Sequence, residues 1–302
     1  MTSEVMAGRR GRGYGCAMNV QTLPAFGGLL REWRERRRLS QFDLSVQTGV
    51  SARHLSRIET GRAEPSRRMV LRLAEALDVP LRERNALLVA AGFAPAWAET
   101  DYWDERLAVA REAIGWILEH HDPLPAVVVD RFGNLLDFNG GAGVLMDGVD
   151  PELLSGRVNL ARVALHPRGM APRLRNFGEV RQYFLDRLRA QLAVDDHPAV
   201  TGLIEEVLAY EPVAPDDGGW DGASPSPIAL PLRVRSRHGD LSMFTTIATF
   251  GAPRDVTVSE LAVELFFPLD DTTRRAFAAA AGGGGTEPIG AAEAARTGRE
   301  GD

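Results

Sequence analysis

Residues 39–62, LSQFDLSVQTGVSARHLSRIETGR, combine two helix caps with one tight turn. Ser40 can cap a short helix, Gly49 can supply the positive φ that ends it, and Ser51 can cap a second helix directly afterwards. Two short helices that are joined this tightly must cross at a steep angle. The run therefore predicts a helix-turn-helix, in which the second helix lies in the major groove of DNA.

The second predicted helix has a basic outward face. Val50, Leu55 and Ile58 have the spacing of inward-pointing residues, which leaves the other side free for base contacts. Arg53 and Arg57 lie one helical turn apart, so both guanidinium groups can reach base edges, and each is expected to bind a guanine. The predicted DNA contacts are Gln41, Ser51, Ala52, Arg53, His54, Ser56, Arg57, Thr60 and Arg62.

Some of these contacts would position the protein on DNA without reading its sequence. The Gln41 amide can bind a phosphate, and Thr60 and Arg62 can hold the flanking backbone. The alternative is a solvated face on an ordinary helical hairpin, because arginines one turn apart occur on many surface helices. The two caps, the glycine and the apolar spacing together favour DNA binding.

Basic charge is concentrated at the start of the chain. Residues 1–80 contain 14 arginines against eight acidic residues, a balance of +6. The remaining 222 residues contain 21 arginines against 33 acidic residues, a balance of −12. A basic N-terminal region is typical of proteins that bind a polyanion. The acidic remainder of the chain would repel the same polyanion. All 35 basic residues are arginine, which favours the GC-rich coding of a bacterium.

The order of helices and strands predicts two domains with a disordered tail at each end, 1–25 and 281–302. Residues 26–93 have the spacing of five short helices, an all-α DNA-binding domain. Residues 101–280 form a second domain, which opens with an amphipathic helix. Strands are expected at 126–129, 135–138, 228–234, 241–250 and 258–267. Helices inserted between the second and third strands make this domain α+β.

The sequence also argues against several classes of function. One cysteine, Cys16, gives no disulfide framework. There is no signal peptide and no apolar run of the roughly 20 residues that a membrane span needs, so we expect a cytoplasmic protein without a membrane partner. The histidines of EHHDP diverge on a helix and have no second ligand cluster, so no metal is expected. No nucleophile elbow, phosphate-binding glycine loop or HExxH motif occurs, and we expect neither catalysis nor a cofactor.

The run RERRRLSQFDLSVQTGVSARHLSRIETGR resembles the central motif of the XRE, or lambda-repressor-like, transcriptional regulators. The resemblance extends over residues 26–93 and implies a five-helix domain that binds double-stranded DNA sequence-specifically. It also implies that Arg34 on the first helix pairs with Glu59 at the end of the recognition helix. Ser45 stands where that family usually has alanine.

The rest of the chain resembles the MmyB-like subfamily in the segments PSRRMVLRLAEALDVPLRERNALLVAAGFAP, LHPRGMAPRLRNFGEVR, IATFGAPRDVTVSEL and ELFFPLD. The resemblance implies a PAS-like α+β sensor domain with about five antiparallel strands. It implies a small hydrophobic ligand, an acid of fatty-acid type, and a homodimer that binds an inverted repeat. Where the subfamily commonly has a Trp–Arg pair, this chain has Val180 and Arg181.

Polar side chains that alternate with apolar ones in LHPRGMAPRLRNFGEVRQYFLDRL predict where the ligand binds. A cationic or amide group at the mouth of an apolar pocket suits a carboxylate with a long tail. Arg173 and Arg181 are the expected anchors. Alternatively, the arginines are solvated and Asn176 caps the helix that begins near Phe177. The predicted ligand contacts are His166, Arg173, Asn176, Arg181 and Phe184.

Two further questions stay open at the level of sequence. Trp103, Trp116 and Ile117, on the helix that opens the second domain, are expected to be core residues, with a dimer seam or a contact between the domains as alternatives. The competing function is a ligand-binding or dimerisation protein whose helix-turn-helix contacts another protein.

Overall fold

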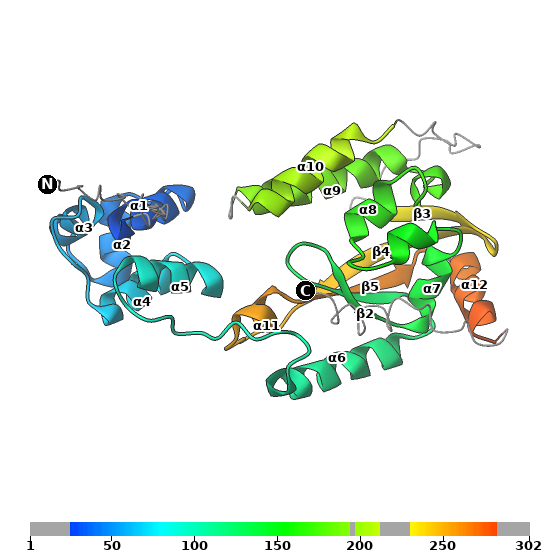
Figure 1. The fold of residues 1–302 in the computed structure, drawn as a ribbon, viewed down its shortest axis with the longest axis horizontal. Coiled ribbons are helices and arrows are strands. Elements are labelled where there is room, and N and C mark those ends of the chain that lie inside the picture. Colours follow the sequence, from blue (N-terminus) through cyan, green and yellow to red (C-terminus); the bar gives the residue numbers. More distant parts are fainter. Residues whose placement is uncertain (1–24, 194–196, 212–229, 283–302) are drawn as a thin grey trace, which may run out of the picture. The chain divides into compact units, whose positions relative to one another are not determined.

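The computed structural model describes residues 25–193, 197–211 and 230–282 (Figure 1). Contacts divide the chain into two compact units, Met1–Ala96 and Trp97–Asp302. The described part of the first unit is helical, and the second unit is α+β, as predicted. The predicted tails, 1–25 and 281–302, lie almost entirely outside the described residues.

The first unit is built from five short helices. They are α1 (Phe26–Arg36), α2 (Gln41–Thr48), α3 (Ala52–Glu59), α4 (Arg67–Ala76) and α5 (Leu81–Ala90). Each helix turns its apolar side inward, where burial of apolar surface stabilises the unit. The fully buried side chains include Leu30, Leu44, Leu55, Ile58, Val70, Leu73 and Leu88.

The caps predicted for α2 and α3 are present. The Ser40 hydroxyl accepts a hydrogen bond from the Asp43 N–H at 3.1 Å, and the Asp43 carboxylate accepts one from the Ser40 N–H at 2.9 Å. Gly49 ends α2 at a φ of 63°, a left-handed conformation that glycine adopts without strain. Ser51 then accepts from the His54 N–H at 3.3 Å and begins α3. The turn therefore fixes the direction of α3 relative to α2.

Another glycine brings α1 directly against α3. A Cβ atom at Gly27 would lie 2.4 Å from the carbonyl oxygen of Ile58 and 2.6 Å from that of Glu59. Because no side chain fits in that space, the backbone of α1 can contact the last turn of α3 only if residue 27 is glycine. This contact sets the depth at which α3 lies in the unit.

The second unit contains a five-stranded antiparallel sheet in the order β2-β1-β5-β4-β3. The predicted hairpin of the first two strands is present, with Val127 opposite Phe138. The last strand in sequence lies at the centre and joins this hairpin to the hairpin of β3 and β4. The strands are β1 (Ala126–Val129), β2 (Leu135–Phe138), β3 (Pro231–Ser236), β4 (Gly239–Ala248) and β5 (Ala262–Pro268).

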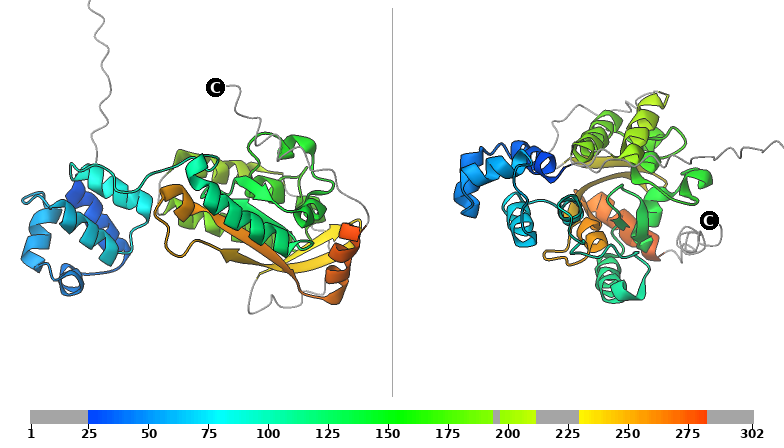
Figure 2. Two further views of the ribbon diagram at one scale, coloured as in Figure 1. Left: turned by 90° about the horizontal axis from the view of Figure 1, so that it is seen from below. Right: turned by 60° about the vertical axis from the view of Figure 1, so that its left-hand side comes forward.

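Helices cover both faces of this sheet (Figure 2). On one face, Ile114 and Leu118 of α6 belong to one core with Val128 of β1. On the other face, Leu188 of α9 belongs to a larger core with Val127 of β1. The helices are η1 (Glu105–Leu107), α6 (Ala108–His121), α7 (Gly140–Met146), η2 (Pro151–Leu154), α8 (Leu160–Leu165), η3 (Ala171–Arg173), α9 (Phe177–Leu192), α10 (Pro198–Ala209), α11 (Val256–Glu260) and α12 (Asp271–Gly282).

The start of the fifth strand differs from the prediction. A strand was expected at 258–267, but β5 begins only at Ala262. The Asp255 carboxylate accepts hydrogen bonds from the N–H groups of Thr257 and Val258 at 2.9 and 3.4 Å. This cap starts the short helix α11, which replaces the first residues of the expected strand.

The prediction that the large apolar residues of α6 are core was wrong for two of them. Trp116 is 59% exposed and Ile117 is 38% exposed. The sheet lies on the opposite side of the helix, where Ile114 and Leu118 are buried. Trp103, which precedes η1, does pack against that buried cluster.

Within the described ranges, no helix combines the length and the apolar character that crossing a bilayer requires. The same residues contain no cluster of three or more His, Cys, Asp or Glu side chains that could hold a metal ion. The two histidines of EHHDP contact backbone carbonyls. His120 Nδ1 lies 2.8 Å from the Trp116 oxygen, and His121 Nε2 lies 2.9 Å from the Phe266 oxygen.

Candidate nucleic-acid interface and ligand pocket

Helix α3 buries its apolar side and presents its polar side to solvent. Leu55 and Ile58 are buried, so Arg53 and Arg57 point outward, and both are exposed. Among the described residues, Arg53 has no hydrogen-bond or ion-pair partner. One N–H of Arg57 lies at the long distance of 3.5 Å from the Arg62 carbonyl. Both guanidinium groups are therefore available to bind base edges.

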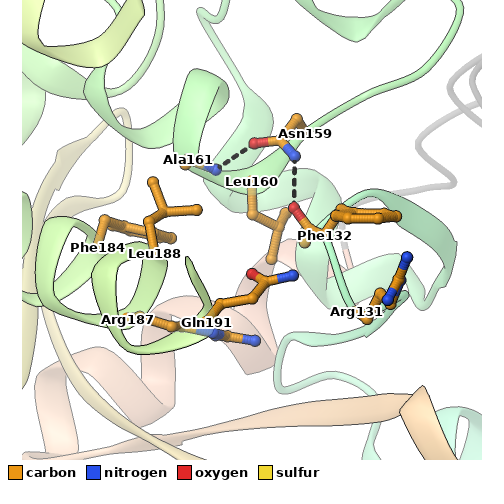
Figure 3. A pocket seen from close by; sticks show the side chains of 10 residues that line it. Arg131, Phe132, Asn159, Leu160, Ala161, Phe184, Arg187, Leu188 and Gln191 are labelled. Atoms are coloured by element: carbon orange, nitrogen blue, oxygen red, sulfur yellow. Dashed lines mark hydrogen bonds between the residues drawn. The ribbon is translucent and has the colours of Figure 1, made fainter. Parts of the chain in front are cut away.

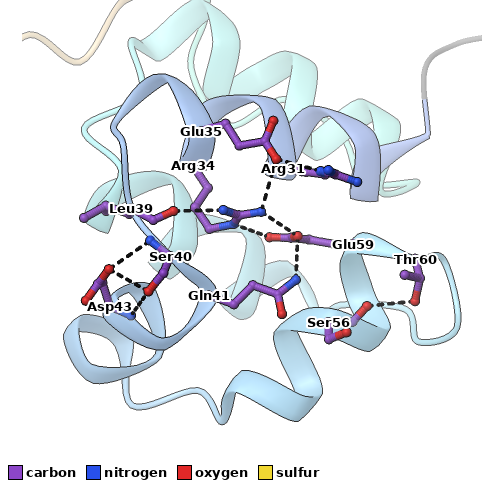
Figure 4. A network of polar contacts seen from close by, with 10 residues as sticks. All are labelled: Arg31, Arg34, Glu35, Leu39, Ser40, Gln41, Asp43, Ser56, Glu59 and Thr60. Atoms are coloured by element: carbon purple, nitrogen blue, oxygen red, sulfur yellow. Dashed lines mark hydrogen bonds and ion pairs between the residues drawn. The ribbon is translucent and has the colours of Figure 1, made fainter.

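A buried ion pair holds the end of α3 against α1 (Figure 4). Arg34 donates to the two carboxylate oxygens of Glu59 at 2.7 and 3.0 Å and to the Leu39 carbonyl at 2.8 Å. Only 10% of the Arg34 side chain and 3% of the Glu59 side chain are exposed. The hydrogen bonds with Glu59 raise the pKa of Arg34 and outweigh the opposing effect of burial. This is the pair that the family resemblance implies.

Gln41, which was predicted to bind phosphate, belongs to the same network. Its side-chain N–H donates to Glu59 Oε2 at 2.8 Å (Figure 4). An amide group has two N–H donors, so one remains for a phosphate. Gln41 thus joins the start of α2 to the end of α3 and can still contact DNA.

The other predicted DNA contacts differ in whether they have a hydrogen that can be donated to a phosphate. The Ser51 hydroxyl accepts from the backbone of α3, which leaves its own hydrogen for a phosphate. The Thr60 hydroxyl instead donates to a carbonyl of α3 at 2.7 Å, so it has no hydrogen left for a phosphate. Arg62 is exposed beyond the end of the helix. Partly exposed on α3 are Ala52, His54 and Ser56.

In the second unit, a small pocket opens between α9, the turn after β1 and the start of α8 (Figure 3). Its volume of about 320 Å³ includes open solvent, and the enclosed part has room for about one water molecule. Apolar and polar side chains line it in about equal number, and small-molecule sites also combine the two kinds. The main lining side chains are Phe132, Leu160, Phe184 and Leu188, together with Arg131, Asn159, Arg187 and Gln191.

Arg187 brings a positive charge to this pocket. Its guanidinium lies 2.5 Å from the carboxylate of Glu264 on β5, whose side chain is only 7% exposed. Burial disfavours the charged form of Arg187, but the charge and hydrogen bond of Glu264 raise the pKa of Arg187 above its usual value. Because a guanidinium has five N–H donors, Arg187 can neutralise Glu264 and still donate to an anion in the pocket.

Two polar residues shape the walls of the pocket. Asn159 accepts from the Ala161 N–H at 3.1 Å and donates to the Phe132 carbonyl at 2.9 Å, which ties the start of α8 to the turn after β1 (Figure 3). The Arg131 guanidinium lies 4.3 Å from the centre of the Phe132 ring. Arg131 and Arg187 are therefore the two cationic side chains of the lining.

Phe184 is the predicted ligand contact that lines this pocket. Arg187 and Gln191 were not among the predicted contacts, although their spacing from Phe184 places all three on one face of α9. A search for polar residues on the face of Phe184 would have found both. No local pattern places Arg131 or Asn159 there, because each comes from a distant part of the chain.

Three other predicted ligand contacts do not line the pocket. The His166 ring meets the Tyr210 ring edge to face, with 4.8 Å between centroids. Arg173 donates to the Leu145 carbonyl at 2.9 Å, and burial lowers the pKa of Arg173. Arg181 lies partly exposed on α9. Arg173 and Arg181 are therefore not brought together as a joint anchor at this pocket.

Asn176, the remaining predicted contact, is buried and has a structural role. Its amide N–H groups donate to the Pro231 carbonyl at 2.7 Å and to Glu179 at 2.8 Å, and its carbonyl accepts from the Arg233 N–H at 3.2 Å. These bonds tie the start of α9 to β3. The side chain makes no cap bond to the helix, and no amide hydrogen is left for a ligand.

A helix-turn-helix with a basic recognition helix, joined to a separate α+β unit, is the architecture of a ligand-regulated transcription regulator. Residues 25–87 match a helix-turn-helix domain family, and residues 110–280 match the MmyB-like transcription regulator ligand binding domain. The second match covers more than half of the chain, and the chain belongs to this MmyB-like family. The family is one of transcription regulators and not of enzymes.

The chain is also similar to the HTH-type transcriptional repressor RghR of Bacillus subtilis (strain 168), with 40% identity over 72 residues. These residues make up 24% of this chain and 51% of the repressor, so the chain spans about half the length of this curated relative. A structure described as an RNA-binding light-oxygen-voltage receptor is 14% identical and covers 85% of this chain and 61% of its own. Its TM-score of 0.23 does not establish a shared fold.

Proposed function

We propose that this regulator binds an inverted repeat of double-stranded DNA as a homodimer, under the control of a small hydrophobic acid bound in the second unit. It would act in the cytoplasm without a membrane partner. The observation that carries the proposal is the exposed pair Arg53 and Arg57 on a helix that the buried Arg34 and Glu59 hold in place.

In the proposed complex, α3 lies in the major groove and its two outward arginines read bases. Arg53 and Arg57 would each form two hydrogen bonds with O6 and N7 of a guanine. Ser51, Gln41 and Arg62 would bind phosphates and set the register of the protein on the duplex. Sequence reading and positioning are thus assigned to different side chains.

Arg53→Ala and Arg57→Ala are each expected to relax specificity at one base position, at a cost of about 1–3 kcal/mol. Footprinting of genomic DNA with the full-length protein gives the operator, and affinity is then measured for operators with single-base changes. Arg62→Ala is the control, because loss of a phosphate contact should weaken binding to all operators alike. A uniform loss in the Arg53 and Arg57 variants would refute base reading by α3.

A second function is favoured by the apolar surface of α2. Phe42 is 68% exposed and Val46 is 67% exposed, one helical turn apart, where another protein could dock. In that case the chain would be a ligand-binding or dimerisation protein whose helix-turn-helix serves protein contacts. A salt titration separates the two functions, because affinity for duplex DNA should fall steeply with salt if phosphates are neutralised.

The ligand is proposed to bind in the pocket beside Arg187. A carboxylate could bind the guanidinium while an apolar tail packs against Phe184 and Leu188. The two recognition helices of a dimer must bind two half-sites, about one turn of the DNA helix apart, at the same time. A ligand that changes the angle between the two DNA-binding units would therefore cost base contacts at both half-sites.

Native mass spectrometry of the purified full-length protein is expected to detect a co-purifying hydrophobic acid. Gln191→Trp places a large ring in the pocket and should remove most of this ligand. Gln182→Trp is the matched control, because Gln182 is exposed and lies on the same helix outside the pocket lining. If wild-type protein carries no small molecule and binds none, the second unit serves dimerisation alone.

A further inference from the structure

The chain enters the second unit through a segment that is hydrogen-bonded to α11. Residues from Trp97 onward belong to the second unit. The Val256 N–H at the start of α11 donates to the Ala98 carbonyl at 2.8 Å, and Ala98 pairs with Asp255 in a parallel β-bridge. The Thr100 hydroxyl donates to Asp255 at 2.6 Å, and Thr100 is only 3% exposed. These contacts of Ala98 and Thr100 with the start of α11 form a linker latch.

The carboxylate of Asp255 serves the latch and the helix at the same time. One oxygen accepts from the Thr100 hydroxyl. The other oxygen caps α11, because it accepts from the N–H groups of Thr257 and Val258. Since one side chain makes both sets of hydrogen bonds, a shift of this five-residue helix changes the geometry of the latch.

The far end of α11 carries a counter-ion of the pocket. Glu260, the last residue of α11, forms an ion pair with Arg131 at 3.8 Å, and both side chains are 20% exposed. Glu264, four residues later on β5, forms an ion pair with Arg187. Both arginines line the pocket (Figure 3). The two cations of the pocket are thus balanced by carboxylates of the one segment that begins at Asp255.

We propose that an anion in the pocket opens the linker latch through α11. The inference rests on the ligand of the proposed function and names the way in which it regulates DNA binding. A bound carboxylate leaves two cations to balance three anions, so the attraction between Arg131 and Glu260 weakens. β5 is hydrogen-bonded to a strand on each side, whereas α11 lies outside the sheet. The end of α11 is therefore the part that moves.

An open latch weakens binding to an inverted repeat. Release of Ala98 and Thr100 lengthens the segment that connects the two units. When one DNA-binding unit of a dimer is bound, the effective concentration of the other unit at the second half-site falls as the connection becomes longer. A single half-site needs only one unit, so the affinity for it should not change. The ratio of the two affinities therefore reports the state of the latch.

Thr100→Val and Thr100→Ser test the latch in the full-length protein. Valine keeps the shape of threonine without the hydroxyl, whereas serine keeps the hydroxyl without the methyl group. Thr100→Val should lower the affinity for the inverted-repeat operator at least about threefold and leave the affinity for a half-site unchanged. Thr100→Ser should bind both like the wild type. Hydrogen exchange at the Val256 amide, which donates to Ala98, shows directly whether the latch is open.

Glu260→Gln tests the connection between the latch and the pocket. It removes the charge that pairs with Arg131, so it should lower the affinity for the inverted repeat as Thr100→Val does. The two changes together should cost no more than either alone, because both open the same latch. Asp186→Asn is the matched control, since Asp186 is an exposed carboxylate on α9 that pairs with Arg189. It should leave both affinities unchanged.

Octanoate, an aliphatic carboxylate, tests the anion itself. Its binding to the wild type and to Thr100→Val is measured by native mass spectrometry. In the wild type it should lower the protection of the Val256 amide against exchange and the affinity for the inverted repeat. In Thr100→Val, where the latch is already open, bound octanoate should change that affinity little.

The outcomes separate this inference from the proposed function. Octanoate that does not bind the wild type overturns the proposed ligand and the anionic signal with it. Octanoate that binds and leaves the Val256 amide protected overturns the latch as the route, while the reading of DNA by α3 still stands. Equal affinities of Thr100→Val and Thr100→Ser for the inverted repeat, or additive losses for Thr100→Val and Glu260→Gln, also overturn it. Loss of inverted-repeat affinity in Thr100→Val but not Thr100→Ser, together with opening by octanoate, supports the inference.

Discussion

Arg34→Ala is expected to lower the free energy of unfolding of the first unit by about 3–5 kcal/mol, because it leaves the Glu59 carboxylate buried without its cation. Gln41 alone would then hold that carboxylate. DNA binding should be lost with the fixed position of α3. Urea unfolding gives the stability, and hydrogen exchange at the amides of α1, α2 and α3 shows that the loss lies in this unit.

The control for this effect is the exposed pair Arg31 and Glu35 on α1. The distance between Arg31 Nε and Glu35 Oε1 is also 2.7 Å, but the side chains are 64% and 53% exposed, so Arg31→Ala should leave the stability nearly unchanged. Arg34→Met combined with Glu59→Leu removes both charges and should recover part of the stability. Equal losses for Arg31→Ala and Arg34→Ala would show that the buried pair does not hold the recognition helix.

Arg187→Ala is expected to destabilise the second unit by about 3 kcal/mol and to abolish ligand binding. Glu264 would stay buried on β5 without its cation. Removal of one partner of a buried ion pair costs about 3–5 kcal/mol, and the lower value applies because the Arg187 side chain is 33% exposed. Hydrogen exchange at the amides of β5 and α9 reports the stability of this region. Native mass spectrometry of the same sample reports the ligand.

A double variant separates the two roles of Arg187. Arg187→Ala with Glu264→Gln removes the buried negative charge, so stability should largely return while ligand binding stays lost. Arg162→Ala is the control, because the Arg162 and Glu206 side chains are 40% and 36% exposed and their pair should contribute less than about 1 kcal/mol. A double variant that still binds the ligand would show that Arg187 is not the anchor.

The helix-turn-helix could be predicted because its signals are local. Ser40, Gly49 and Ser51 cap and end their own helices, and the helical period alone assigns Arg53 and Arg57 to the outer face. The signal for α11 was local as well. Asp255 precedes the residues whose N–H groups it caps, so its position predicts a helix start in place of the first residues of the expected strand.

The pocket could not be predicted in the same way. Arg187 meets Glu264, a residue 77 positions later in the chain, because β5 takes the central place in the sheet. Strand order is a non-local property that the period of a single strand does not specify. Trp116 shows the same limit on α6: both sides of that helix carry apolar residues, and only the position of the sheet decides which side is buried.

The central position of β5 has a consequence for regulation. Successive side chains of a strand point to opposite faces, so Glu264 meets Arg187 of α9 while Val263 and Leu265 support α6. The proposed effector anchor and helix α6 therefore lie on opposite faces of one strand. Any factor by which an effector in the pocket alters dimerisation must equal the factor by which dimerisation alters effector affinity.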